Sequence, residues 1–317
     1  MWLTGIDEAG YGPVLGPLVM SAVTFEVPQQ SPSLDLWHLL GSAVCAPGTP
    51  ANGRLMVGDS KKLFSQTRGL RALEIACLSF ARLLDEHCWR RLDLFLDLLQ
   101  GKPETIRRDG PWFESLDLPL PTTVPPKVLD NQTTSLRWAL AQTGIHLHSI
   151  RTSIVLPLQF NQLIQRTGNK ATLLFDLCAA HLRQTVALPG THTVVVDKHG
   201  GRNHYAHHLL SCGLPAASMN ESAERSTYRI ASDCQALRTV HFVARADQSH
   251  FTVALASMFS KYVRELLMRL FNRFWAQLVP GLKPTAGYPA DAARFVQDIE
   301  PALHRVGINV AHIWRCR

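Results

Sequence analysis

Four acidic residues are the part of this sequence that could do chemistry. Asp7 and Glu8 follow an apolar opening segment. Asp197 ends a run of β-branched residues, and Asp247 precedes a long stretch of apolar residues at helical spacing. Hard divalent cations such as Mg²⁺ prefer carboxylate oxygens and keep several waters. Two such ions, about 3.5–4 Å apart, can activate a water and stabilise the leaving oxygen of a phosphodiester. Carboxylates from separate elements are what such a site needs.

Each of these carboxylates also has an ordinary structural interpretation. Asp7 and Glu8 fit an exposed acidic turn of a hairpin. Asp197 fits the entry to a loop, and Asp247 fits a helix N-cap with no catalytic role. Spacing alone does not decide between these interpretations and a metal site.

A glycine-rich bend follows the first two carboxylates. Neighbouring side chains of a regular strand point to opposite faces, so the pair reaches one metal site only if the strand ends or twists between them. Gly10 and Gly12 permit such a twist, and they leave backbone N–H groups bare for a phosphate or a ribose. We expect strands over residues 2–6 and 18–26 to form an antiparallel hairpin around this bend.

The remaining elements alternate between helices and strands. A continuous β-branched run over residues 192–197 predicts a central buried strand. Apolar residues at helical spacing predict a long helix from about residue 249. Residues 28–56 look loop-like. One further helix is expected to begin at an N-cap on Ser65 and to run to Leu84. Other helices are expected over residues 85–100, 134–143, 159–187 with a break near Gly168, 203–211 and 290–304. Other strands are expected over residues 145–156, 227–231, 240–246 and 310–314.

Composition suits a folded protein with a sizeable core and a polyanionic partner. The 317 residues are 46% hydrophobic and 18% charged, and the formal net charge is +7. The seven cysteines are scattered without a Cys-x-x-Cys pair, which argues against a disulfide framework and a structural zinc site. No run reaches the roughly 18 apolar residues of a membrane span. We expect a cytoplasmic monomer with no membrane partner.

Several motifs together resemble one known family. Residues 5–13 (Gly-Ile-Asp-Glu-Ala-Gly-Tyr-Gly-Pro) resemble the opening motif of type 2 ribonucleases H, also called ribonuclease HII. Residues 59–63 (Asp-Ser-Lys-Lys-Leu) resemble the next motif, and residues 196–197 the central strand that ends in aspartate. Residues 246–247 are similar to the fourth carboxylate before its helix, and residues 287–289 (Gly-Tyr-Pro) to the tyrosine near the C-terminal segment.

The resemblance implies a ribonuclease H-like α/β fold, with a mixed central sheet flanked by helices and a helical C-terminal segment. Residues 1–280 would form the catalytic domain, and residues 281–317 would pack on it. The proline-rich stretch 101–130 would be an extended excursion over the surface, without regular helix. The implied activity is that of a hydrolase: endonucleolytic cleavage of RNA in RNA–DNA hybrids, or of ribonucleotides embedded in DNA, that leaves 5′-phosphate and 3′-hydroxyl ends.

The resemblance also implies roles for individual residues. Two Mg²⁺ or Mn²⁺ ions would be held by the four carboxylates, Asp7, Glu8, Asp197 and Asp247. The predicted substrate contacts are backbone atoms of Gly10 and Gly12 at the ribose 2′-OH, the side chain of Tyr11 between them, Ser60 and Lys61 at a phosphate, and Tyr288 stacked beside a sugar at an RNA–DNA junction.

Two positions depart from the family pattern. Tyr11 stands where the family usually has arginine, and Lys198 follows Asp197 where the family often has glycine. Two alternatives therefore stay open: a nucleic-acid-binding protein of the same fold that has lost catalysis, and a nuclease that cuts DNA strands or junctions. His199 could assist proton transfer. Six basic residues fit either a nucleic-acid path or a solvated face: Lys198, Arg202, Arg225, Arg229, Arg238 and Arg245.

Overall fold

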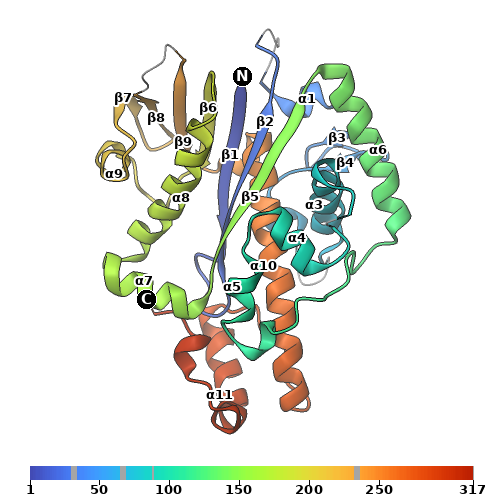
Figure 1. Ribbon diagram of the computed structural model, residues 1–317, viewed down its shortest axis with the longest axis vertical. Helices are drawn as coiled ribbons and strands as arrows, with labels where there is room; N and C mark the ends of the chain where they lie inside the picture. The colour runs from blue at the N-terminus through green and yellow to red at the C-terminus, as the bar shows by residue number, and fades with distance from the viewer. Residues whose placement is uncertain (30–33, 65–68, 88, 232–235, 317) are drawn as a thin grey trace.

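The computed structural model describes residues 1–29, 34–64, 69–87, 89–231 and 236–316 (Figure 1). Ser65, the expected N-cap of the first long helix, lies outside the described residues. No helix in these ranges is long and apolar enough to cross a membrane.

A seven-stranded mixed sheet forms the centre of the molecule, with the strand order β5-β2-β1-β6-β9-β8-β7. In that order the strands are β5 (His146–Val155), β2 (Leu18–Glu26), β1 (Trp2–Ala9), β6 (His192–Asp197), β9 (Arg238–Val243), β8 (Arg225–Ile230) and β7 (Ala216–Glu221). Strands β1, β6 and β9 are parallel, whereas the pairs on either side of them are antiparallel. The carboxyl ends of the three central strands therefore meet at one edge.

Helices cover both faces of this sheet (Figure 1). The helices are α1 (Leu36–Leu39), α2 (Ser60–Leu63), α3 (Arg71–Leu84), α4 (Leu92–Leu98), α5 (Pro103–Arg107), α6 (Pro126–Thr143), α7 (Pro157–Thr167), α8 (Lys170–Val186), α9 (Ala206–Ser211), α10 (Phe251–Leu278) and α11 (Pro289–Val306), with short 3-10 helices η1 (Pro111–Phe113), η2 (Ala246–Gln248) and η3 (Val310–His312) and a two-stranded parallel sheet of β3 (Val44–Cys45) and β4 (Leu55–Met56). Helix α10 packs in the core on one face, and α8 packs in the core on the other.

Contact between β1 and α10 depends on one glycine. A Cβ at Gly5 would lie 2.1 Å from the backbone carbonyl carbon of Thr252, so no side chain fits there. The backbones of the first strand and the longest helix consequently touch. This contact sets the start of α10 beside the carboxyl half of β1, close to the edge at which the central strands end.

The predicted fold class is confirmed: the chain forms a mixed α/β sheet flanked by helices, with a helical C-terminal segment. The expected breaks at Gly144 and Gly168 are both present, because each glycine ends a helix in the left-handed conformation. The strand expected over residues 310–314 is wrong. Those residues form η3, and Trp314 makes only an isolated bridge to Leu15. Strand β7 was not expected.

The prediction for residues 101–130 is partly wrong, because this stretch contains α5, η1 and the start of α6. Trp112 and Phe113 are buried, so the stretch contributes to the core. The fully buried carboxylate of Glu74 in α3 also holds the stretch 101–130 in place. The carboxylate accepts hydrogen bonds from the N–H and hydroxyl groups of Thr122 and Thr123, and from the hydroxyl of Tyr262.

Replacing Glu74 should destabilise the protein strongly. In Glu74→Ala, five donors lose their acceptor, among them the buried hydroxyl of Tyr262, and the expected loss in the free energy of unfolding is about 3–5 kcal/mol. Urea unfolding measures this loss. Glu104→Gln is the matched control, because Glu104 is exposed and pairs only with Arg107 of its own helix; it should cost about 0.5 kcal/mol or less. Equal losses in the two variants would contradict the anchoring role of Glu74.

Candidate active site

The sheet edge at the ends of β1 and β6 brings the predicted carboxylates together. Strands β1 and β6 pair up to Ile6 and Val196, so Asp7 and Asp197 are the next residues on neighbouring strands. Strand β9 leads into η2, which carries Asp247. The Ala246 N–H of η2 donates to Oδ1 of Asp197 at 2.7 Å, which ties this turn to the end of β6.

The negative charges of these carboxylates repel one another. Burial, and then the charges of Glu8 and Asp197, raise the pKa of Asp7 well above its ordinary value. Burial and the Asp197 charge raise the pKa of Glu8 to about 7, whereas Lys61 lowers it. Burial and the Asp247 charge raise the pKa of Asp197 to about 6. The four side chains therefore form one electrostatic cluster, which we call the acidic cluster (Asp7, Glu8, Asp197 and Asp247).

Strand β1 continues past both of its carboxylates. A shared metal site was expected to need the strand to end or twist between them. Asp7 pairs with Ser21 and Glu8 with Met20, and the strand continues to Ala9. The Asp7 carboxylate accepts a hydrogen bond from Ser257 of α10. Burial, followed by the charge of Glu8, raises the pKa of Cys178 in α8, which packs on the other face of the sheet. The two carboxylates thus lie on opposite sides of the strand.

The chemistry of the acidic cluster fits a hard divalent cation better than its arrangement does. Its donors are all carboxylates, and burial and mutual repulsion raise their pKa values, whereas a bound cation would favour their ionised forms. Among the described residues, however, no group of three or more His, Cys, Asp or Glu side chains is arranged to hold a metal ion.

Two residues beside the acidic cluster were not predicted from the sequence. Asp59, the N-cap of α2, accepts from the Lys61 N–H at 2.9 Å, and burial followed by the Asp59 charge raises the pKa of Asp247. Ser257 hydrogen-bonds to Asp7 and lies 3.0 Å, oxygen to oxygen, from Ser60. Asp59 stands directly before the predicted pair Ser60 and Lys61, which was the available signal. Ser257 gave no signal beyond its place in the long helix.

Ser60 and Lys61 differ in their surroundings. Ser60 is buried, and its hydroxyl is used by Ser257. Lys61 is exposed and lines a groove of about 860 Å³ that Tyr288 also lines. Tyr288 is 53% exposed. Helix α10 contributes Lys261 and Arg269 to the same groove, so cationic side chains and an exposed aromatic ring share one hollow surface.

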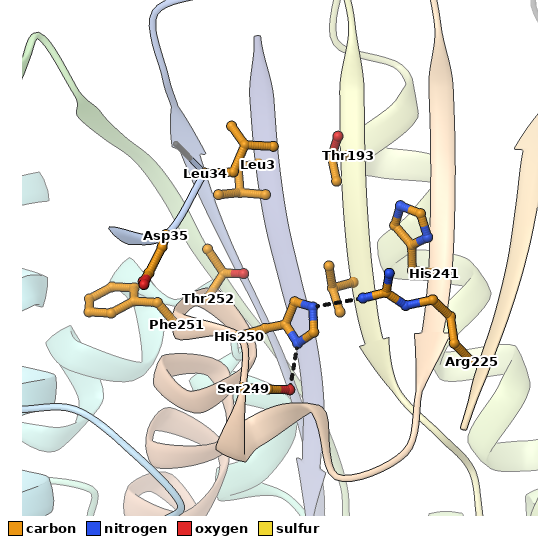
Figure 2. Close-up of a pocket in the computed structure, with 11 residues that line it drawn as sticks. Leu3, Leu34, Asp35, Thr193, Arg225, His241, Ser249, His250, Phe251 and Thr252 are labelled. Atoms are coloured by element: carbon orange, nitrogen blue, oxygen red, sulfur yellow. Dashed lines mark hydrogen bonds between the residues drawn. The ribbon is translucent and has the colours of Figure 1, made fainter. Parts of the chain in front are cut away.

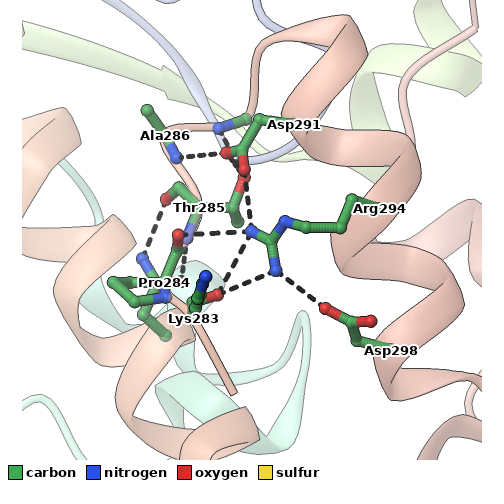
Figure 3. A network of polar contacts seen from close by, with 9 residues as sticks. Lys283, Pro284, Thr285, Ala286, Asp291, Arg294 and Asp298 are labelled. Carbon is green, nitrogen blue, oxygen red and sulfur yellow. Dashed lines mark hydrogen bonds and ion pairs between the residues drawn. The ribbon is translucent and has the colours of Figure 1, made fainter. Parts of the chain in front are cut away.

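The turn before Tyr288 is braced by Arg294 of α11 (Figure 3). Arg294 donates to the carbonyls of Lys283 and Pro284, and pairs with Asp291 and Asp298. The Asp291 carboxylate in turn accepts from the Thr285 hydroxyl at 2.5 Å and from the Ala286 N–H at 3.1 Å. This network holds the backbone that leads to the predicted stacking ring.

The glycine-rich bend is enclosed by residues distant in sequence. Gly10 has φ +93°, and a Cβ there would lie 2.4 Å from the Pro17 carbonyl oxygen and 2.9 Å from Nε of Arg264. A Cβ at Gly12 would lie 3.8 Å from the Tyr288 ring. The ring of Tyr11 lies 5.6 Å from Nζ of Lys170. The predicted substrate contacts Gly12 and Tyr288 are therefore neighbours.

A smaller pocket lies at the start of α10, which follows Asp247 in the sequence (Figure 2). Its volume is about 250 Å³. Arg225, one of the six basic residues, donates to Nε2 of His250 at 3.3 Å, and His250 contacts Ser249. Lys198 does not face this pocket, because Nζ donates to Asn203 and to the Ser222 carbonyl.

A role for His199 in proton transfer is not supported. The ring is buried against Phe175 and Tyr205, and burial followed by the Arg202 charge lowers its pKa to about 3. A histidine with that pKa is neutral near pH 7 and is a weak base there.

No protein-family profile matches the chain, and no curated protein matches its sequence. Similar solved structures include ribonuclease H2 from Pyrococcus horikoshii OT3, with 15% identity, a TM-score of 0.44 and coverage of 99% of this chain and 92% of that one. RNase HII of the PCNA:RNase HII complex from Archaeoglobus fulgidus has 14% identity, a TM-score of 0.39 and coverage of 100% and 96%. Bst-RNase HIII in complex with Mn²⁺ has 16% identity, a TM-score of 0.40 and coverage of 99% and 66%.

These similar structures are ribonucleases H of types 2 and 3. Similarity at this level does not establish what this chain does. The activity has to follow from the residues of this chain.

Asp197→Asn should stabilise the metal-free protein at alkaline pH and not at acidic pH. Because the pKa of Asp197 is raised to about 6, ionisation of this carboxyl opposes folding. The cost is absent below the unfolded-state pKa of about 4, grows as the pH rises and is complete above the folded-state value. Asparagine does not ionise, and its oxygen can still accept from the Ala246 N–H.

Urea unfolding in a chelator measures this difference. At about pH 8 the variant should gain on the order of 1–3 kcal/mol over the parent, and at about pH 4 the gain should vanish. A gain that does not change with pH would mean that charge repulsion in the acidic cluster is not its cause.

Proposed function

We propose that this protein is a metal-dependent endoribonuclease. Its substrates would be RNA in RNA–DNA hybrids or ribonucleotides embedded in DNA, and its products would carry 5′-phosphate and 3′-hydroxyl ends. The observation that supports this proposal is the acidic cluster at the shared edge of β1 and β6, beside a groove lined by Lys61 and Tyr288.

Four carboxylates would hold the metals: Asp7, Glu8, Asp197 and Asp247. When bound, two Mg²⁺ or Mn²⁺ ions supply an activated water and stabilise the leaving 3′-oxygen of the phosphodiester. The Ala246 N–H keeps one oxygen of Asp197 occupied and fixes the orientation of its carboxylate. Burial keeps bulk water from screening the cluster.

The groove beside the cluster would hold the nucleic acid. Lys61 is exposed next to the carboxylates, and its ammonium would bind a backbone phosphate. The exposed ring of Tyr288 would stack against a sugar or base. Backbone atoms of Gly10 and Gly12 would contact the 2′-OH, which separates RNA from DNA.

Cleavage of three labelled duplexes tests the substrate class: a full RNA–DNA hybrid, a DNA duplex with one ribonucleotide, and an all-DNA duplex, each with Mg²⁺ or Mn²⁺. We expect the hybrid to be cut and the DNA to be left intact. Equal cutting of the all-DNA duplex would identify a DNA-strand nuclease instead. Metal-independent binding of the hybrid with no turnover would identify a binding protein that has lost catalysis.

Asp197→Asn should reduce the rate of hybrid cleavage by a factor on the order of 10³ or more, because a metal-holding carboxylate is lost. Single-turnover kinetics measures the rate, and circular dichroism checks the fold. Asp130→Asn is the matched control, because Asp130 lies on the distant helix α6, where it pairs with Arg82 of α3. A fully active Asp197→Asn protein would refute the assignment of the site.

Lys61→Met and Tyr288→Ala should weaken hybrid binding and leave the acidic cluster in place. The loss of one phosphate contact in Lys61→Met should reduce the slope of log affinity against log salt by about 0.7–0.9. Tyr288→Ala should weaken binding by about 1–3 kcal/mol without changing that slope. Titration of a labelled hybrid in Ca²⁺ at several salt concentrations separates the two effects, and an unchanged affinity in both variants would exclude the groove as the substrate path.

A further inference from the structure

The segment that follows η3 lies between the glycine-rich bend and α7. The Arg315 N–H donates to the Val14 carbonyl at 2.8 Å. On the other side, Asn161 of α7 donates to the carbonyls of Ala311 and Trp314 at 3.1 and 2.9 Å, and its oxygen accepts from the Cys316 N–H at 2.7 Å. Backbone and side-chain contacts thus hold this segment on both sides.

The guanidinium of Arg315 binds the bend directly. It is 1% exposed, and Nη2 donates to the carbonyl of Gly10 at 2.6 Å and to the carbonyl of Pro13. These two carbonyls stand on either side of Tyr11 and Gly12. One guanidinium nitrogen therefore fixes both ends of the four-residue loop 10–13.

Ring contacts extend the same support to the side chain of Tyr11. The Arg315 guanidinium carbon lies 4.9 Å from the centre of the Phe160 ring. Nζ of Lys170 lies 6.0 Å from that ring and 5.6 Å from the ring of Tyr11. Cations at these distances attract aromatic faces, so Arg315, Phe160, Lys170 and Tyr11 form a continuous series of contacts.

The burial of Arg315 is costly for the fold. Among the described residues, its Nε and Nη1 have no hydrogen-bond partner. Burial, followed by the charge of the nearby Arg264, lowers its pKa to about 9. An apolar side chain at this position would avoid the desolvation of the charge, but it would leave the carbonyls of Gly10 and Pro13 without their donor. Both partners of the guanidinium belong to one loop, which points to the shape of that loop.

We propose that Arg315 is a positioning residue that holds loop 10–13 in the conformation that receives the nucleic-acid substrate. This inference rests on the proposed function, in which Tyr11 and the flanking glycine backbones contact that substrate. Arg315 itself touches the loop and not the substrate. Its loss should therefore act on substrate binding much more than on the chemical step.

Arg315→Met tests this role, because it keeps an apolar chain of similar length and removes the donors. The melting temperature should change by no more than a few degrees, and the loop amides of Tyr11 and Gly12 should exchange hydrogen faster. KM for the hybrid should rise roughly 10- to 100-fold with kcat nearly unchanged. Arg315→Lys should restore part of the affinity, since an ammonium can still reach a carbonyl.

Arg54→Met is the matched control. Arg54 also donates to three backbone carbonyls, those of Gly41, Pro50 and Ala51, in a loop that contributes none of the predicted site residues. The Arg54→Met variant should leave both KM and the amide hydrogen exchange of loop 10–13 unchanged. An equal rise in KM in the two variants would mean a general loss of structure and would overturn the proposal.

Failure of the proposed function can be distinguished from failure of this inference. If the unmodified protein cuts none of the three duplexes, the proposed function fails, and hydrogen exchange together with hybrid affinity in Ca²⁺ still measures the role of Arg315. If the unmodified protein cuts the hybrid and Arg315→Met keeps its KM, its affinity and its loop protection, the positioning role is overturned.

Discussion

The repulsion among buried carboxylates at one sheet edge is the constraint on which the rest of the structure depends. Asp7 and Asp197 stand side by side because β1 and β6 are parallel and in register. Both are largely withdrawn from water, and their ionised forms disfavour each other. Such an edge persists only when the surrounding elements are rigid. The two layers of helices over the sheet and the backbone contact at Gly5 provide that rigidity.

Buried arginines solve a second problem, which is the shape of an irregular loop beside that edge. Turn residues leave carbonyl oxygens without partners in the sheet, and buried carbonyls need donors. Arg264 supplies donors to the carbonyls of Leu15 and Ala286 from α10. Arg315 supplies donors to the beginning of the same loop. A fork of fixed N–H groups suits this task better than an ammonium, because its donors have a defined direction.

The sequence predicts best the features that local pattern determines. The β-branched run of β6, the hairpin of β1 and β2 and the apolar spacing of α10 all lead to the observed elements. Glycines mark the ends of α6 and α7 for a steric reason, since both adopt positive φ. The order of the motifs brought the four carboxylates to attention, and the topology of the parallel strands explains why they meet.

Features that need a distant partner were missed or misjudged. Proline content suggested an extended stretch over 101–130, yet the carboxylate of Glu74 and the buried ring of Trp112 fold it into the core. A strand was expected over residues 310–314, but Val310–His312 form η3 and Trp314 makes an isolated bridge to Leu15. The contact of the Ser60 hydroxyl with Ser257 of α10 was also not foreseen, and the role of Ser60 at a phosphate stays a prediction. Local sequence contains none of these partners.

The hydrogen bond between Arg315 and Gly10 joins residues that are 305 positions apart. Loop 10–13 is therefore held in its folded shape only once the segment around residue 315 has folded back against it. The strand that carries Asp7 likewise waits for β6 and α10 before it has neighbours on both sides. Pairings of such long range close large loops and slow folding. The contacts that shape the loop beside Asp7 and Glu8 therefore form only when parts of the chain that are distant in sequence come together.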